Sequence, residues 1–513
     1  MASFVNATTA TGTLRGIEVG GVNRFLGVPY GGAAGGDSRF MRPTPPPSWV
    51  GVRDAFAYGS ICPQLPSDPR RPFTIMEDLD VQPGDLSEDC LNLNVWTPGL
   101  GPSAKRPVLV YFHGGGWTRL SANHHLYTGD RLARFGDVVV VTVNHRLGAL
   151  GAINLVDLGA PEEFADSGHV GMLDLQQALQ WVKANIENFG GDPNRVTIFG
   201  QSGGGRKASV LMAMPSANGL YHRAFVQSGS TVTQPTRDQA AALTVRLLNQ
   251  LGIDRSQATT LQNVPMTTLI KAQDDIGATV GAAFGEFQPF VDGRWLPDDP
   301  FGSKAPAGAA KVPMLIGYCL NDSGWSRPNF DLDEAGLLAE LTGMLGEPTA
   351  RRAIDLYRGL YPDYTSYLVQ TTIITDRDLQ RRVLSQADRK AEQGAAPVWV
   401  YRYDWPSPWR EGVYGAVHGM DMAAVFYNQN QATLASRPEA AALTEKLAST
   451  VVNFARSGDP NGGGFPRWPA YETTERAMLL IDHPQSRVAG DPARATREFW
   501  VTHEPGDLSI KCA

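Results

Sequence analysis

Residues 195–209 read RVTIFGQSGGGRKAS, a short apolar run followed by a glycine-rich turn and then by small residues suited to a helix. Gly200, Ser202 and Gly204 match G-x-S-x-G, and the pattern occurs nowhere else in the chain. A turn this tight between a strand and a helix tolerates little side chain on either side of the serine, and it exposes the hydroxyl at the helix N-terminus. The segment therefore predicts a nucleophile elbow with Ser202 at its tip.

Two phosphate-binding turns compete with that interpretation. A phosphate loop requires G-x-x-x-x-G-K-[ST], but Arg206 stands where the lysine is needed, and Lys207 comes one residue too late. A dinucleotide turn, G-x-G-x-x-[GA], fits the glycines. Its expected acidic residue about 20 positions further on is missing, however, because no Asp or Glu lies between Ala208 and Asp238.

The segments around the elbow alternate between predicted strands and helices. Strands are predicted over residues 107–112, 137–143, 195–199, 312–317 and 398–403, and a helix over residues 172–188. The first two strands are apolar throughout, which is typical of strands buried on both faces. The alternation predicts an α/β fold with a mostly parallel central sheet, helices on both faces and large loop insertions. No repeat, charge block or polar linker divides the chain, so we expect one domain over residues 1–513.

Three consecutive glycines follow the strand PVLVYF, in the run His113-Gly114-Gly115-Gly116. This HGGG pattern matches a motif whose backbone N–H groups bind the oxyanion formed during acyl transfer. We expect the N–H groups of Gly115 and Gly116, with that of Gly203 after the serine, to form the oxyanion hole. The alternative is an ordinary flexible loop, which the position of the glycines upstream of an elbow disfavours.

A nucleophilic serine also needs a base, and in this fold the chain order is serine, acid, histidine. Four histidines follow Ser202, namely His222, His418, His483 and His503. His222 precedes any strand that would carry the acid, and the last two lie in segments without a glycine cluster. His418 lies in the glycine-flanked loop YGAVHGMDM and is the predicted base.

The acid is expected just past a strand. Asp322, in VPMLIGYCLNDSGW, meets that requirement, whereas its neighbour Asn321 cannot carry the charge. The competing interpretation of Asp322 is a surface aspartate that caps the next turn. Asp421, close to the predicted base, is the next candidate for the acid.

Composition limits the partners and the compartment. The 513 residues include 45 Lys and Arg against 52 Asp and Glu, which gives a net charge of −7 and no basic footprint for nucleic acid. No apolar stretch reaches the length of about 18 residues that a membrane span needs. No signal peptide is visible at the N-terminus, so we expect a cytoplasmic protein, or a secreted one if a signal has been removed. None of the four cysteines forms a CxxC pair, so zinc and redox motifs are not expected.

Several further motifs make the sequence resemble the type-B carboxylesterase family, which includes the cholinesterases. They are FLGVPY (25–30), SEDCLNLNVW (87–96), NHRLG (144–148), NFGGDPNRV (188–196), FA (454–455) and GDPN (458–461). The resemblance covers almost the whole chain and implies an α/β-hydrolase fold that cleaves carboxylic esters.

The resemblance also bears on single residues. Asp322 falls on the position of the family's acid, which is usually glutamate, and His418 matches the family's G-x-x-H-G-x-[ED] context. Ser228 matches a serine that lies near the acid, and Cys62 and Cys90 match a family disulfide. This sequence departs from the family in having Gln201 where glutamate usually precedes the serine, and Gly203 where alanine usually follows it.

The expected mechanism is hydrolysis of a small-molecule ester through an acyl-enzyme on Ser202, with His418 as base and Asp322 as the orienting acid. No metal or organic cofactor is expected. Two rivals remain: carbamate or amide hydrolysis by the same triad, and a non-catalytic binding protein on this fold. The natural substrate and the oligomeric state are not predicted.

Overall fold

The computed structural model describes residues 3–66, 84–280, 287–428 and 437–504. One sheet runs through it, in the strand order β1-β2-β3-β5-β7-β6-β8-β9-β10-β11-β12-β13, with β4 paired to β2. The strands are β1 (Ser3–Thr9), β2 (Gly12–Val19), β3 (Val22–Pro29), β4 (Val52–Asp54), β5 (Asn92–Thr97), β6 (Arg106–Phe112), β7 (Val139–Val143), β8 (Gly191–Gln201), β9 (Arg223–Gln227), β10 (Met314–Cys319), β11 (Val398–Tyr403), β12 (Ala477–Ile481) and β13 (Arg487–Gly490).

Every neighbouring pair from β7 to β12 is parallel. The other neighbouring pairs in this order are antiparallel. They are β1–β2, β2–β3, β3–β5 and β5–β7 at one end of the sheet, and β12–β13 at the other. The predicted α/β fold with a mostly parallel central sheet is therefore confirmed.

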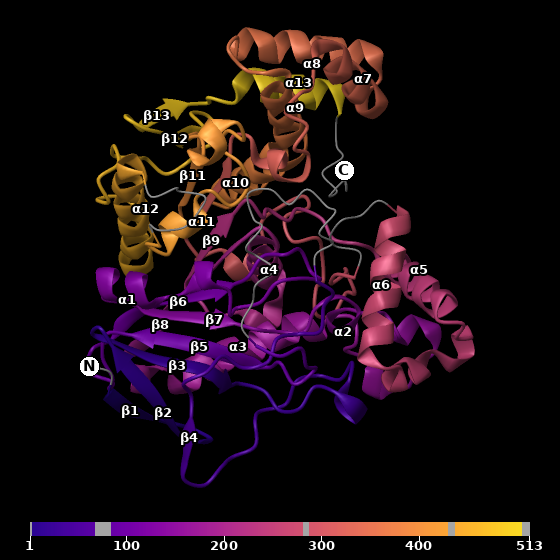
Figure 1. Cartoon of the computed structure of the whole chain (residues 1–513), viewed down its shortest axis with the longest axis vertical. Coiled ribbons are helices and arrows are strands. Elements are labelled where there is room, and N and C mark those ends of the chain that lie inside the picture. Colours follow the sequence, from indigo (N-terminus) through magenta and orange to yellow (C-terminus); the bar gives the residue numbers. More distant parts are fainter. Residues whose placement is uncertain (1–2, 67–83, 281–286, 429–436, 505–513) are drawn as a thin grey trace.

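Helices cover both faces of this sheet, because side chains of the central strands alternate between two apolar clusters. Val108, Val110 and Phe112 of β6 join one cluster. It includes residues of α3 (Val170–Asn185), α4 (Gly203–Ala213) and α10 (Arg381–Gln393). Leu109 and Tyr111 join the other, with residues of α1 (Asp130–Gly136), α11 (Met422–Val425) and α12 (Pro438–Ser457). Figure 1 shows α1 and α12 on the left side of the molecule, with α11 next to α12.

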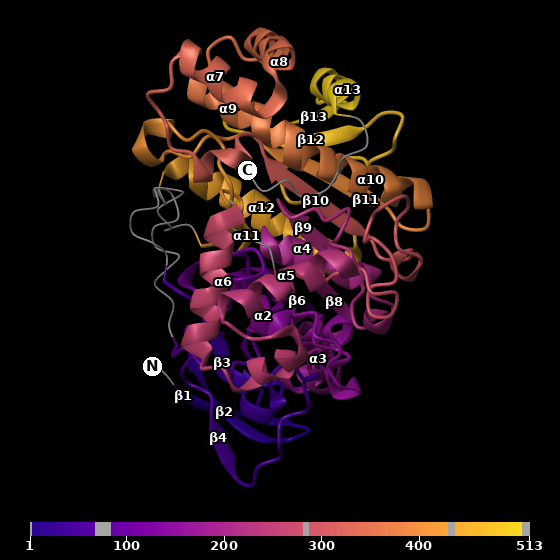
Figure 2. The same cartoon turned by 90° about the vertical axis from the view of Figure 1, so that its right-hand side faces the viewer.

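The remaining helices belong to the insertions. They are α2 (Gly148–Gly151), α5 (Arg237–Gln250), α6 (Met266–Val280), α7 (Glu334–Leu345), α8 (Glu347–Leu360), α9 (Ser366–Thr375) and α13 (Arg494–His503). The helices α7, α8, α9 and α13 share an apolar cluster of their own that includes Trp500. In both views they form the end of the molecule opposite to β1, β2 and β4 (Figures 1 and 2).

The parallel strands bring the predicted site residues to one edge of the sheet. Phe112 of β6 is level with both Val143 of β7 and Gly200 of β8, and Gln227 of β9 is level with Gly317 of β10. The loops that leave these strands carry the HGGG run, the elbow serine and the predicted acid. Ligands of open parallel sheets bind at this carboxyl edge, so the fold places the candidate groups where a site is expected.

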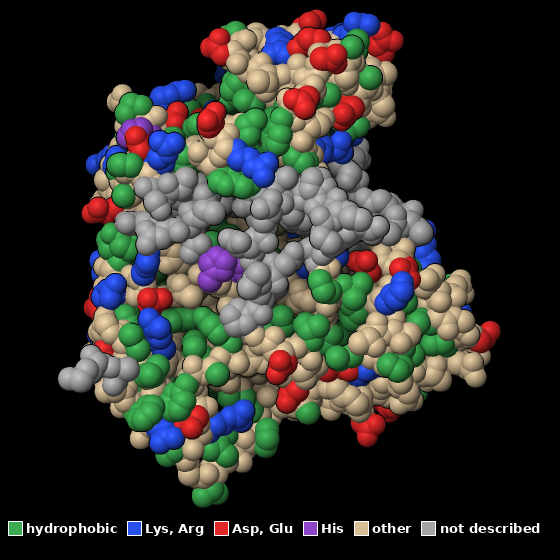
Figure 3. All heavy atoms as spheres, viewed as in Figure 1, with side chains coloured by type: hydrophobic (Ala, Val, Ile, Leu, Met, Phe, Trp, Pro, Cys, Tyr) green, Lys and Arg blue, Asp and Glu red, His purple; other side chains and the backbone are tan. Residues whose placement is uncertain are grey.

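The surface carries charges of both signs. On the face drawn in Figure 3, Lys and Arg side chains are interspersed with Asp and Glu, most densely over α7 and α8, and the described residues of that face show no continuous basic band. Among the helices that the structure describes, none is long and apolar enough to cross a membrane.

Candidate active site

Ser202 lies at a strained turn between β8 and α4. Its backbone angles, φ 57° and ψ −124°, are unusual for a residue with a side chain, and its N–H donates to the Gln227 carbonyl at 2.8 Å. The neighbouring glycines are sterically required, because a Cβ on Gly204 would lie 1.9 Å from the Phe112 carbonyl oxygen. The strand–turn–helix expected from the sequence is present, and the half-buried Ser202 precedes the first residue of α4.

His418 and Asp322 form a short, buried hydrogen bond across 96 residues of sequence. Imidazole Nδ1 lies 2.6 Å from Asp322 Oδ1, and both residues are less than a tenth exposed. The second oxygen of the carboxylate, Oδ2, accepts from the Ser228 hydroxyl at 2.7 Å and from the Cys319 N–H at 3.3 Å. This arrangement holds the proton of a neutral imidazole on Nδ1 and leaves the lone pair on Nε2.

Asn321, which the sequence excluded only as an acid, connects the two loops of this pair. Its backbone N–H donates to the Ala416 carbonyl at 2.9 Å, and its side-chain oxygen accepts from the Ala416 N–H at 2.9 Å. Its amide nitrogen donates to Thr372 Oγ1 at 2.8 Å. The loop after β10 is thereby fixed to the loop that carries His418. An asparagine next to an aspartate gives no signal from which this role could be read.

Asp421, the second candidate for the acid, is engaged elsewhere. Its Oδ2 accepts hydrogen bonds from Gln227 Nε2, at 3.0 Å, and from the Tyr401 hydroxyl. Complete burial raises the pKa of this carboxyl, and the Tyr401 hydrogen bond acts in the opposite direction. The geometry therefore favours Asp322 over Asp421 as the partner of the imidazole.

The side chain of Gln201 occupies the other nitrogen of the imidazole. Gln201 Nε2 lies 3.0 Å from His418 Nε2, so the amide donates to the lone pair that faces the elbow. In the described part of the chain, the Ser202 hydroxyl makes no hydrogen bond. The indole of Trp325 lies beside the imidazole, with 5.8 Å between the ring centroids. The sequence singled out Gln201 as a departure from the family, but not for this contact.

The HGGG loop lies directly against the elbow. Gly115 and Gly116 have φ values of 77° and 61°, a region that favours glycine. A Cβ on Gly203 would lie only 2.1 Å from the Gly116 carbonyl oxygen. Among the described residues, no group accepts a hydrogen bond from the N–H of Gly115, Gly116 or Gly203. Three unpaired backbone donors thus lie on adjoining segments next to the serine.

The sequence profile of the carboxylesterase family matches residues 3–500. The chain belongs to the carboxylesterase family. It is a type-B carboxylic-ester hydrolase. The para-nitrobenzyl esterase of Bacillus subtilis is 35% identical over 500 residues, which cover 96% of this chain and 97% of that protein. The phenmedipham hydrolase of Pseudarthrobacter oxydans is 34% identical over 505 residues, covering 95% and 97% of the two chains.

Solved structures of the family agree with the fold. The carboxylesterase EST55 of Geobacillus stearothermophilus superposes with a TM-score of 0.82 at 34% identity, and the match covers 96% of this chain and 99% of that one. A structure of para-nitrobenzyl esterase gives a TM-score of 0.80 at 34% identity, covering 97% and 100%. The α/β-hydrolase fold that the resemblance implied is therefore confirmed.

The disulfide that the family resemblance implied is not formed in this structure. Cys62 and Cys90 are buried free thiols. The Leu147 N–H donates to Cys62 Sγ at 3.2 Å. A hydrogen bond to Cys62 and burial both raise the pKa of the Cys90 thiol well above its ordinary value. Cys319 is also a buried free thiol, and Cys512 lies outside the described residues.

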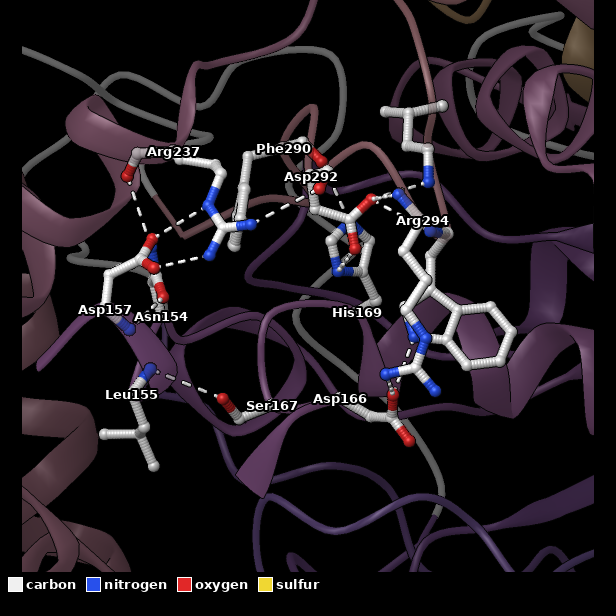
Figure 4. Close-up of polar contacts among 12 residues, drawn as sticks. Asn154, Leu155, Asp157, Asp166, Ser167, His169, Arg237, Phe290, Asp292 and Arg294 are labelled. Carbon is white, nitrogen blue, oxygen red and sulfur yellow. Dashed lines mark hydrogen bonds and ion pairs between the residues drawn. The ribbon is translucent and has the colours of Figure 1, made fainter. Parts of the chain in front are cut away.

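A second grouping of serine, histidine and aspartate, shown in Figure 4, is arranged differently. His169 Nε2 lies 2.8 Å from the Phe290 carbonyl, and Nδ1 lies 3.6 Å from Asp292 Oδ2. The Ser167 hydroxyl accepts from the Leu155 N–H at 3.3 Å. Because the carbonyl can only accept, it holds a proton on Nε2 and prevents that nitrogen from acting as a base toward serine. This cluster therefore connects the segment that carries His169 to the segment that carries Phe290 and Asp292.

No metal site accompanies these groups in the part of the chain that the structure describes: three or more His, Cys, Asp or Glu side chains nowhere gather in a suitable arrangement.

The contact between Gly203 and Gly116 leads to a prediction. The methyl group of Gly203→Ala would overlap the Gly116 carbonyl, so the HGGG loop must shift. We expect kcat for p-nitrophenyl acetate to fall by about 10- to 100-fold, because a displacement of about 1 Å is that costly in an active site. Gly359→Ala on α8 is the matched control, since its methyl would meet nothing within 4 Å. Equal activity of the two variants would show that the loop position does not matter.

Proposed function

We propose that Ser202, His418 and Asp322 form the catalytic triad with which this carboxylesterase cleaves carboxylic esters of small molecules. The observation that carries the proposal is the 2.6 Å contact between Asp322 and the Nδ1 of His418. It leaves Nε2 on the side of Gln201, the residue that immediately precedes the serine of the elbow. Serine, base and acid also follow one another in the chain order of this fold.

The first half of the reaction transfers the acyl group to the enzyme. His418 Nε2 accepts the proton of Ser202 Oγ while the oxygen attacks the ester carbonyl, and the imidazolium then protonates the departing alcohol. The Gln201 amide must release Nε2 as the serine hydroxyl turns toward it. The second half repeats these proton transfers with water as nucleophile, and it releases the acid and restores Ser202.

Asp322 would act by orienting the imidazole and by stabilising its charged form. The Ser228 hydroxyl and the Cys319 N–H both donate to Asp322 Oδ2, which directs Oδ1 toward His418. Aspartate is one methylene shorter than the glutamate usual at this position. The backbone junction between Asn321 and Ala416 compensates by bringing the two loops together.

The N–H groups of Gly115, Gly116 and Gly203 would bind the negative oxygen of the tetrahedral intermediate. Two observations support this role: no described residue accepts a hydrogen bond from these N–H groups, and the segments that carry them are in contact. Backbone donors fixed before the reaction stabilise the developing charge without reorganising. Loss of a single donor of this kind typically costs about 3 kcal/mol of transition-state stabilisation.

The substrate class can be tested by comparing matched substrates. A relative of this chain is named a para-nitrobenzyl esterase, so p-nitrobenzyl acetate is the first ester to use. The corresponding p-nitrobenzyl carbamate differs only in the group attached to the carbonyl carbon, which is an amino group in place of the methyl. We expect kcat/KM to be higher for the ester, because carbamate nitrogen donates electrons to the carbonyl and deactivates it. Preference for the carbamate would favour the rival activity, and absence of turnover on both would favour a binding protein.

A further inference from the structure

Lys207 is a buried lysine directly beneath the candidate site. It lies on α4, five residues after Ser202, and its side chain is fully shielded from solvent. Its Nζ donates hydrogen bonds to the carbonyl oxygens of His113, at 2.9 Å, and of Gly116, at 3.2 Å. These two residues are the first and last of the HGGG run, so a single amine joins both ends of that loop.

The loop needs such a restraint. Consecutive glycines restrict the backbone less than any other residues, and Gly115 and Gly116 both have positive φ values. The carbonyl of Gly116 that accepts from Lys207 is also the atom against which Gly203 packs. A hydrogen bond to this carbonyl therefore acts on the junction between the loop and the elbow.

The surroundings of Lys207 make its burial costly. Burial and, to a smaller extent, the nearby charge of Arg206 lower the pKa of its amine to about 7. The charged or titratable groups that face it are Arg206 on the same helix and the imidazoles of His113 and His145, which follow β6 and β7. Burial, and then Lys207 itself, hold the pKa values of both imidazoles well below the ordinary value. An apolar residue would avoid this cost, which indicates that the amine has a role.

Binding of a phosphate does not account for this lysine. In a phosphate loop the lysine faces the ligand, whereas Lys207 is fully buried, with its Nζ on two protein carbonyls and 5.7 Å from the Trp117 ring centroid. The near match to the phosphate-loop pattern thus has a different explanation.

We propose that Lys207 is a positioning residue for ester hydrolysis, whose amine holds both ends of the HGGG loop so that the backbone N–H groups of Gly115 and Gly116 face the oxyanion. The inference rests on the oxyanion hole proposed above. The HGGG motif by itself attributes the position of these N–H groups to the glycines. The inference adds that a side chain of α4 holds them in that position.

The test compares Lys207→Met with wild type on p-nitrophenyl acetate. Methionine keeps the length of the side chain and removes both hydrogen bonds. We expect kcat to fall by about 10- to 100-fold with KM within about threefold, because the loss affects transition-state geometry and not binding. The matched control is Lys390→Met on α10, since Lys390 is equally buried and donates to the Ala309 and Ala310 carbonyls at 2.9 and 2.8 Å, away from the elbow. Its kcat should stay within about threefold of wild type.

The pH dependence separates positioning from a merely structural role. The ammonium form makes the stronger hydrogen bonds. The kcat ratio of wild type to Lys207→Met should therefore be largest near pH 6 and fall as the pH rises past about 7. A ratio near one at every pH would overturn the proposal, and so would a pH-independent loss that Lys390→Met shares.

Two further variants keep the test decisive. If Lys207→Met does not fold, as judged by circular dichroism, Lys207→Gln supplies a neutral polar side chain, and the same kcat loss and pH-dependent ratio are expected. Ser202→Ala is measured in parallel. An active Ser202→Ala would refute the proposed triad itself, whereas an inactive Ser202→Ala beside a Lys207 variant with wild-type kcat would refute only the role of Lys207.

Discussion

Replacing Ser202 with alanine should lower kcat for p-nitrophenyl acetate by about 10⁴- to 10⁶-fold, the scale on which serine hydrolases lose activity without their nucleophile. The hydroxyl is the only group of Ser202 that changes, and it makes no hydrogen bond among the described residues. The fold should therefore be retained, with an unchanged circular dichroism spectrum. The residual rate should come from the backbone donors and from substrate binding.

The control for this variant is a serine outside the site. Ser216 is exposed, and its hydroxyl donates to Gln176 at 2.7 Å. Ser216→Ala should keep wild-type kcat and KM. A folded Ser202→Ala protein with more than about a tenth of wild-type kcat would contradict the assignment of the nucleophile, because a general loss of stability could not explain retained activity.

Asp322→Asn should have the second-largest effect, a fall in kcat of about 10⁴-fold. The amide can donate a hydrogen to Nδ1, which stabilises the tautomer that carries its proton on Nε2. That tautomer cannot accept the proton of Ser202, although the shape of the site barely changes. KM should move much less than kcat, since both oxygens of this buried carboxylate are already bound by protein groups.

Asp421→Asn is the matched comparison, because Asp421 is equally buried and close in sequence to His418. Its carboxylate accepts from Gln227 and Tyr401 instead of from the imidazole. We expect its kcat to remain within about tenfold of wild type. Should Asp421→Asn be the inactive variant and Asp322→Asn the active one, the two aspartates would exchange roles.

The central part of the fold could be predicted from the sequence, whereas both edges of the sheet could not. The strands β6, β7, β8, β10 and β11 are predicted from short, mainly apolar runs, and those of β6 and β7 are apolar throughout because both faces are buried. The first strands, such as β1 with its sequence SFVNATT, are largely exposed on one side and mix polar with apolar residues. Pairing with β2 stabilises β1, and that contact has no signal within the segment itself.

Of the candidate site, the sequence predicted the residues and the pairing of Asp322 with His418, but not the contacts that Gln201 and Lys207 make. The elbow and the HGGG run are local patterns in which the backbone itself dictates glycine. The contact of Gln201 with His418 spans 217 residues, and that of Lys207 with His113 spans 94. Such contacts depend on the register of neighbouring strands and on the path of long loops, which a single sequence does not specify.

The proposal that Ser202 is the nucleophile is tested most directly by covalent labelling. The folded wild-type protein is treated with a fluorophosphonate, a reagent that phosphonylates an activated serine, and is then digested for peptide mass analysis. We predict one adduct per chain, on the peptide that contains Ser202, with activity lost in proportion to labelling. His418→Ala should suppress the adduct, because the hydroxyl then lacks its base. A folded, active protein that remains unmodified at Ser202 would contradict the account.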